Sequence, residues 1–109
     1  MFIYKGRKID TDQEGYLLDL SLWEEEMVPV LAKREGMALT EDHLQVILLV
    51  RRFYEEYHIS PTIRMLVKKI EKEYGLRKGN SKYLFKLFQE GPAKQATKLA
   101  GLPKPSRCL

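Results

Sequence analysis

Apolar residues recur at helical spacing through most of the chain, and most densely over 41–57. In that stretch the apolar positions are Leu44, Val46, Ile47, Leu48, Leu49, Val50 and Phe53. A helix that is apolar almost all round is typical of the centre of a fold. Thr40 is placed as its N-cap, and Glu41 and Asp42 fall in the first turn, where the helix dipole favours acids. The pattern therefore predicts a central helix that ends near Tyr57.

Four further helices are predicted from apolar periodicity and from start and stop signals. The first begins at Ser21, whose spacing to Glu24 fits a capping box, is kinked by Pro29 and ends near Gly36. The second begins at Ser60-Pro61, read as an N-cap followed by proline at the first helical position, and ends near residue 74. The remaining two cover 81–88, opened by Asn80-Ser81, and 93–100.

The two ends of the chain read differently from this helical body. Short β-prone runs flank Lys5-Gly6, which predicts a small hairpin over 2–9, with a possible third strand at 16–18. Pro103 and Pro105 exclude a helix at the C-terminus, so residues 101–109 are expected to form a flexible, extended arm that contributes nothing to the core. The expected fold is mainly α (α+β), as one domain over 1–109: an orthogonal helical bundle with a helix-turn-helix-like pair, the hairpin and the arm.

Composition excludes several classes of protein. The longest purely apolar run, residues 46–50, is far short of the ~20 residues that span a bilayer, and the first residues lack the core of a signal peptide. We therefore expect a cytoplasmic protein that does not associate with membranes. A single cysteine excludes an internal disulfide framework, and His43 and His58 have no cysteine partner for a metal site. No metal or cofactor is expected.

Charge is distributed unevenly along the chain. Residues 1–57 hold 7 Lys/Arg and 12 Asp/Glu, a net −5, whereas residues 58–109 hold 12 Lys/Arg and 3 Asp/Glu, a net +9. The basic half is explained equally well by a polyanionic or acidic partner and by a solvated lysine-rich surface. A helix-turn-helix DNA reader is one alternative, with Arg64, Lys68, Lys69 and Lys72 on its second helix. That helix lacks the Asn, Gln and Ser side chains that read base edges.

Cys108 is the strongest candidate for chemistry. It is the penultimate residue of a proline-rich segment, where burial of a thiol is not expected. Lys104 and Arg107 lie close in sequence and favour the thiolate, which is the nucleophilic form. An exposed thiol on such an arm is suited to enter the active site of another protein. His43 receives no role from the sequence.

Two stretches, 91–96 (Gly-Pro-Ala-Lys-Gln-Ala) and 99–105 (Leu-Ala-Gly-Leu-Pro-Lys-Pro), precede the penultimate cysteine. Together they closely resemble the C-terminal signature of the DsrC/TusE family. The blocks at 39–43, 52–54, 60–68 and 83–88 resemble the family as well, so the likeness covers nearly the whole chain. Members associated with sulfite reductase carry a second cysteine eleven residues before the penultimate one, where this chain has Thr97. The single-cysteine pattern is similar to the sulfur-relay branch.

The resemblance implies a sulfurtransferase that acts as a persulfide carrier. It implies that Cys108 receives sulfur from a TusBCD-type complex and passes it to an MnmA-type tRNA thiolase, which forms 2-thiouridine at the wobble position. Contact with tRNA would then be indirect. A DsrC-like partner of a sulfite reductase remains the alternative within the family.

Overall fold

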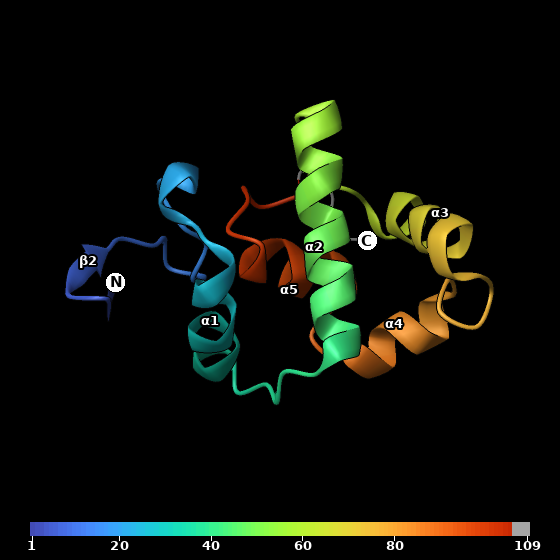
Figure 1. Cartoon of the computed structure of the whole chain (residues 1–109), viewed down its shortest axis with the longest axis horizontal. Helices are drawn as coiled ribbons and strands as arrows, with labels where there is room; N and C mark the ends of the chain where they lie inside the picture. The colour runs from blue at the N-terminus through green and yellow to red at the C-terminus, as the bar shows by residue number, and fades with distance from the viewer. Residues whose placement is uncertain (106–109) are drawn as a thin grey trace.

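The structure, a computed structural model, describes residues 1–105. Its centre is α2 (Glu41–Tyr57), which Figure 1 shows standing between α1 and the pair α3 and α4, with α5 beside it. Val46, Ile47, Leu49, Val50 and Phe53 are buried, which confirms the predicted central helix. Leu44 and Leu48 are only half-buried, because the side of α2 that they occupy lines an open groove.

Three helices follow α2 in the chain and pack against it to complete the core. They are α3 (Ile63–Tyr74), α4 (Ser81–Leu87) and α5 (Pro92–Leu99). Asn80 caps α4 as predicted, accepting a hydrogen bond from the Tyr83 N–H at 2.8 Å. Ala93, Ala96 and Leu99 are buried on α5, and the two alanines let its backbone approach its neighbours closely.

The N-terminal hairpin is present where the sequence predicts it. Strands β1 (Phe2–Tyr4) and β2 (Arg7–Ile9) pair antiparallel, with Phe2 opposite Ile9. Both of these side chains are buried and join the core. In place of a third strand there is one isolated bridge between Thr11 and Leu17. The fold is thus mainly α with a small antiparallel sheet, as predicted.

The first predicted helix differs from the structure. Two short 3₁₀ turns, η1 (Leu20–Leu22) and η2 (Glu25–Met27), precede α1 (Val28–Arg34). Pro29 lies in the first turn of α1, where its missing N–H has no intrahelical partner to lose, so it begins the helix and does not kink it. The expected Ser21–Glu24 capping box is absent, because the Glu24 carboxylate accepts hydrogen bonds from Tyr4 and Lys5.

The start of α3 is also corrected. Thr62 is the N-cap, and its Oγ1 accepts from the Met65 N–H at 3.3 Å. Ser60, the predicted cap, donates its hydroxyl instead to the carbonyl oxygen of Pro103 at 2.8 Å. The local pattern assigned the Ser60 side chain to the start of the helix. In the structure it bonds instead to a residue 43 positions away in sequence.

The segment after α5 does contribute to the core. Leu102 is only 1% exposed and belongs to the central hydrophobic cluster, and Gly101 and Pro105 are buried too. The expectation that residues from 101 onward add nothing to the core is therefore wrong for this stretch. Among residues 1–105, no helix combines the length and hydrophobicity needed to cross a membrane.

Candidate functional site: an anchored C-terminal segment

Two of the three predicted site residues, Arg107 and Cys108, lie outside the described residues. The structure does describe the chain that leads to them. We call residues 99–105 the anchor segment. In Figure 1 it is the red chain that leaves α5 and passes beside the C-terminal half of α2. How this segment is held determines where the chain toward Cys108 begins.

A tight turn at the end of α5 sets the direction of the anchor segment. The Gly101 N–H donates to the Lys98 carbonyl at 3.0 Å, and the Leu102 N–H donates to the Thr97 carbonyl at 3.1 Å. Gly101 has φ +67°, a left-handed conformation that glycine adopts without a Cβ penalty. This is the Schellman arrangement, with Leu102 as the apolar residue that follows it. The turn thereby directs Leu102 into the core.

Three side chains hold the carbonyl groups that the turn leaves without helical partners. Trp23 Nε1 donates to the Leu99 carbonyl at 2.9 Å, and Arg51 Nη1 donates to the Ala100 carbonyl at 2.7 Å. Ser60 Oγ donates to the Pro103 carbonyl at 2.8 Å. The donors come from the loop before α1, from α2 and from the α2–α3 turn. They satisfy backbone acceptors in a stretch that forms no regular secondary structure.

Trp23 and Arg51 also support each other. The Arg51 guanidinium lies 4.4 Å from the centroid of the Trp23 ring, within the range of a cation–π contact. Partial burial lowers the pKa of Arg51 from its ordinary value, although the group stays a cation at neutral pH. A Cβ at Gly101 would lie 2.4 Å from Trp23 Cδ1, so only glycine fits against this ring.

Lys104 ends in an ion pair. Its Nζ lies 2.6 Å from Glu14 Oε1, on the polar loop that follows the hairpin. The sequence prediction placed Lys104 beside Cys108 as support for the thiolate. In the structure the Lys104 ammonium pairs with a carboxylate. The loop that carries Glu14 is therefore a further element that contacts the anchor segment, besides those of Trp23, Arg51 and Ser60.

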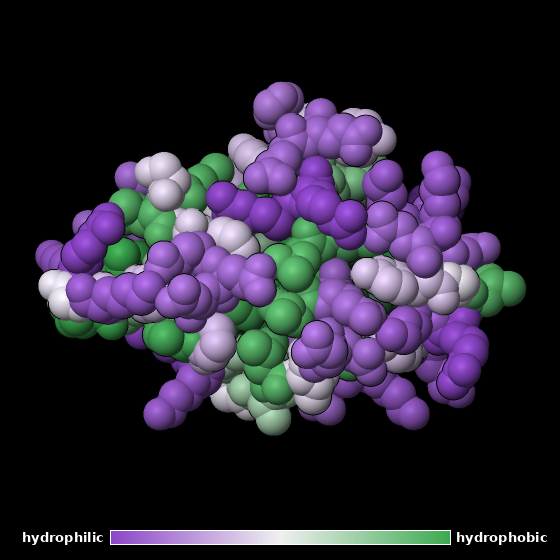
Figure 2. Space-filling view, viewed as in Figure 1, coloured by the Kyte–Doolittle hydropathy of each residue, from purple (hydrophilic) through white to green (hydrophobic). Residues whose placement is uncertain are grey.

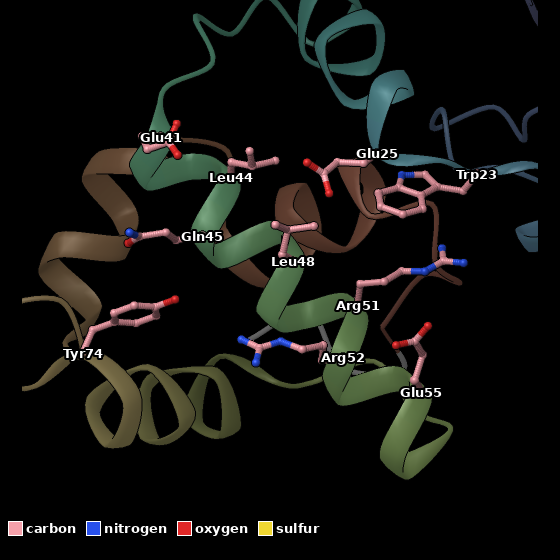
Figure 3. A pocket seen from close by; sticks show the side chains of 10 residues that line it. All are labelled: Trp23, Glu25, Glu41, Leu44, Gln45, Leu48, Arg51, Arg52, Glu55 and Tyr74. Carbon is pink, nitrogen blue, oxygen red and sulfur yellow. The ribbon is translucent and has the colours of Figure 1, made fainter.

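A groove runs along α2 beside the anchor. Figure 2 shows hydrophobic surface between α1 and α2, bordered by hydrophilic side chains. The hollow measures about 380 Å³, and Figure 3 shows Leu44 and Leu48 projecting into it from α2 toward Trp23 and Glu25. Its rim carries both signs of charge: Glu25, Glu41, Glu55, Arg51 and Arg52. Since Trp23 and Arg51 also hold the anchor carbonyls, the groove and the anchor share two residues.

His43, which received no role from the sequence, is structural. Its Nδ1 lies 2.6 Å from Thr40 Oγ1, within a capping box at the start of α2, and its Nε2 lies 2.7 Å from the Leu87 carbonyl. It therefore joins the first turn of α2 to the end of α4. Within residues 1–105, no three His, Cys, Asp or Glu side chains are grouped so as to hold a metal ion.

The sequence analysis missed Trp23, Arg51 and Ser60 as parts of the site. One signal was available, for Arg51 only: it is a cation on the apolar side of the predicted central helix. Such a residue needs an acceptor, and its position on the stripe with Ile47 and Leu48 suggested an inward one. Nothing local identified the Ala100 carbonyl as that acceptor, because the two residues are 49 positions apart.

Comparison with known proteins places this architecture in a family. The model of the family described as DsrC like protein matches residues 3–109. A protein named Sulfurtransferase TusE from Pectobacterium atrosepticum is 58% identical over 109 residues, covering 100% of both chains. A protein of the same name from Yersinia pestis is 56% identical over 109 residues, again covering 100% of both.

Solved structures agree in fold along nearly the full length. The NMR structure of DsrC from Allochromatium vinosum superposes with a TM-score of 0.89 at 46% identity, covering 99% of this chain and 96% of that one. The crystal structure of the oxidized gamma-subunit of the dissimilatory sulfite reductase from Archaeoglobus fulgidus gives 0.84 at 41% identity, covering 96% of each. On sequence and on fold, this chain belongs to the DsrC-like family.

Proposed function

We propose that this protein is a sulfurtransferase that carries sulfur as a persulfide on Cys108. The donor would be a TusBCD-type complex, and the acceptor an MnmA-type tRNA thiolase that forms 2-thiouridine at the wobble position, with no direct contact between this protein and tRNA. The observation that carries the proposal is a single penultimate cysteine in a chain 58% identical, over its full length, to a protein named Sulfurtransferase TusE. The anchor segment supports it, because a carrier needs a defined base for its reactive end.

The chemistry requires one thiol and no cofactor. The Cys108 thiolate attacks the outer sulfur of a donor cysteine persulfide, and a new S–S bond forms to Cys108. The S–S bond in the donor breaks, and the donor cysteine leaves as a thiolate that takes up the proton lost by Cys108. The outer sulfur keeps its oxidation state, so the step consumes no oxidant or reductant. In delivery, a thiolate of the acceptor attacks the outer sulfur on Cys108, and Cys108 leaves as the thiolate.

The single cysteine also bears on the alternative within the family. In a carrier with a second thiol, that thiol can attack the inner sulfur of the persulfide. An internal disulfide then forms, and the outer sulfur leaves as hydrosulfide. In this chain the position eleven residues before Cys108 is Thr97, which is fully buried beneath the anchor segment. The absence of a second cysteine from the sequence favours the relay over a role beside a sulfite reductase that depends on two cysteines.

Intact mass after incubation with a persulfide-loaded donor tests the proposal. The protein should gain one sulfur, about 32 Da, which reductant removes. Cys108→Ser should gain nothing and keep the unfolding midpoint of the parent chain. Sulfur gained by the Cys108→Ser variant would overturn the proposal, and so would a parent chain that gains none from either a protein donor or a small persulfide.

A further inference from the structure

Exposed apolar side chains gather at the corner where α2 turns into α3. Tyr57 is 49% exposed, Ile59 is 51% exposed and Met65 is 38% exposed. Lys69 Nζ lies 6.0 Å from the centroid of the Tyr57 ring, which brings the middle of α3 against the end of α2. We call Tyr57, Ile59 and Met65 the exit surface. Large apolar side chains that gather on a surface mark contact sites more often than isolated ones do.

The exit surface is continuous with the anchor segment. A hollow of about 410 Å³ is lined by Ile59 and Met65 on one side and by Pro103 and Lys104 on the other. Ser60, which holds the Pro103 carbonyl, lies in the same hollow. The apolar corner and the last described residues of the chain therefore form one face of the molecule.

The length of chain beyond this face limits how far the thiol extends from it. Pro105 is buried against the body, and three residues further on is Cys108. At ~3.3 Å per residue, three extended residues separate the two Cα atoms by about 10 Å at most. A donor protein that passes sulfur to Cys108 must therefore bring its reactive cysteine within about one helix diameter of Pro105. Pro103 and Lys104, which immediately precede Pro105, line one hollow with Ile59 and Met65, so a partner that comes this close to Pro105 lies beside the exit surface.

Charge at the corner indicates what kind of surface fits it. Between residues 58 and 70 the chain contains Arg64, Lys68 and Lys69 and no Asp or Glu, whereas the exposed Glu55 and Glu56 precede Tyr57 on α2. Arg64 and Lys68 are exposed and neighbour Met65 on α3. Ile59 and Met65, with these cations on the α3 side, match a protein surface with an apolar depression and carboxylates at its edge. A nucleic acid would satisfy the cations and leave Ile59 and Met65 without partners.

We infer that the exit surface docks the protein that donates sulfur to Cys108, and that this donor has an apolar depression edged by carboxylates beside its reactive cysteine. The inference rests on the proposed function, because it assumes that Cys108 is the thiol that reacts. Docking here lets a short tether suffice: the body binds the donor, and three residues bring the thiol to the persulfide.

The test compares the double variant Ile59→Ser, Met65→Ser with a matched control. Both residues are exposed, so their loss leaves the core intact. The control is Ile3→Ser, Leu76→Ser, which removes apolar side chains of 60% and 71% exposure from the hairpin and from the α3–α4 loop. For each chain, the rate of sulfur gain by Cys108 is measured against the concentration of a persulfide-loaded TusBCD-type complex. A parallel reaction uses glutathione persulfide.

With the exit-surface variant, the half-saturating concentration of the donor complex should rise about tenfold, as when side chains central to an interface are truncated. The maximal rate and the rate with glutathione persulfide should match those of the parent and the control. An unchanged half-saturating concentration would overturn the docking inference and leave the proposed function standing. An equal rise in the control variant would also overturn it. No sulfur gain in the parent from either reagent would instead overturn the proposed function.

Discussion

The hairpin at the N-terminus and the anchor segment after α5 are both short segments outside the helical body, and they are held in opposite ways. The N-terminal hairpin satisfies its backbone largely by itself, through the pairing of β1 with β2. The anchor segment forms no strand, and its carbonyl groups accept from Trp23, Arg51 and Ser60. The hairpin buries Phe2 and Ile9, and the anchor buries Leu102. A stretch without regular secondary structure can therefore have its carbonyl groups satisfied when distant side chains supply the donors.

The largest difference between the two ends should appear at their turn glycines. Gly6 and Gly101 both have positive φ, but a Cβ at Gly6 meets no atom of the described residues within 4 Å, whereas one at Gly101 meets the Trp23 ring. Gly6→Ala should lower the free energy of unfolding by about 1 kcal/mol through backbone strain alone. Gly101→Ala should lower it by about 2–4 kcal/mol, because overpacking adds to the strain. Urea unfolding of the two variants measures both values, and equal losses would contradict a tightly packed anchor.

The second prediction concerns Arg51. Arg51→Met should lower the free energy of unfolding by about 2 kcal/mol, because the Ala100 carbonyl loses a charged donor and the Trp23 ring loses its stacked cation. Arg52→Met is the control: that side chain is exposed and pairs with Glu73, so its loss should change stability by less than about 1 kcal/mol.

Hydrogen exchange identifies where the Arg51 effect occurs. In Arg51→Met, the amides of Gly101 and Leu102 should exchange faster than expected from the global loss of stability, while the amides of the hairpin should not. Uniform acceleration at both ends of the chain would show that Arg51 supports the core in general and not the anchor in particular.

A smaller, stabilising change is predicted under the anchor at Thr97. The Thr97 hydroxyl is buried and has no hydrogen-bond partner among residues 1–105, although the Thr97 carbonyl accepts from Leu102. Thr97→Val keeps the shape of the side chain, removes this unsatisfied group and should raise the free energy of unfolding by about 1 kcal/mol. Thr62→Val should have the opposite sign, because it removes the N-cap of α3. A thermal melt of each variant reports the sign, and destabilisation by Thr97→Val would mean that the hydroxyl has a partner.

The smallest effect is the pH dependence of the hairpin. A hydrogen bond from Lys5, and to a smaller extent one from Tyr4, lowers the pKa of Glu24 below its ordinary 4.5. A depressed folded-state pKa adds stability above the unfolded value, and this stability is lost as the pH falls through the folded value. Hairpin amides should therefore lose protection below about pH 4.5, and Glu24→Gln should flatten this dependence. Gly101 and Leu102 donate to backbone carbonyls, so their protection should change less over the same interval.

Much of the secondary structure was predictable because its signals are local. The apolar periodicity and Thr40 located α2 correctly, and Asn80 located the start of α4. Phe2 to Ile9 formed the expected hairpin. The motifs at 91–96 and 99–105 sufficed to identify the family, because a signature can be read without knowing what its residues contact. The prediction of Cys108 as the reactive residue also came from the sequence, and it remains a prediction.

Tertiary structure alone decided how the end of the chain is held. Two prolines correctly excluded a helix over residues 102–105, yet they carry no information on whether an extended segment is docked. That depended on Trp23, Arg51 and Ser60, whose partners lie 76, 49 and 43 positions away in sequence. Because Ser60 donates to the Pro103 carbonyl, it does not cap α3 as its sequence neighbours suggested. A cap or an apolar stripe acts over a few residues, whereas a carbonyl in a loop finds its donor only after the fold has brought remote elements together.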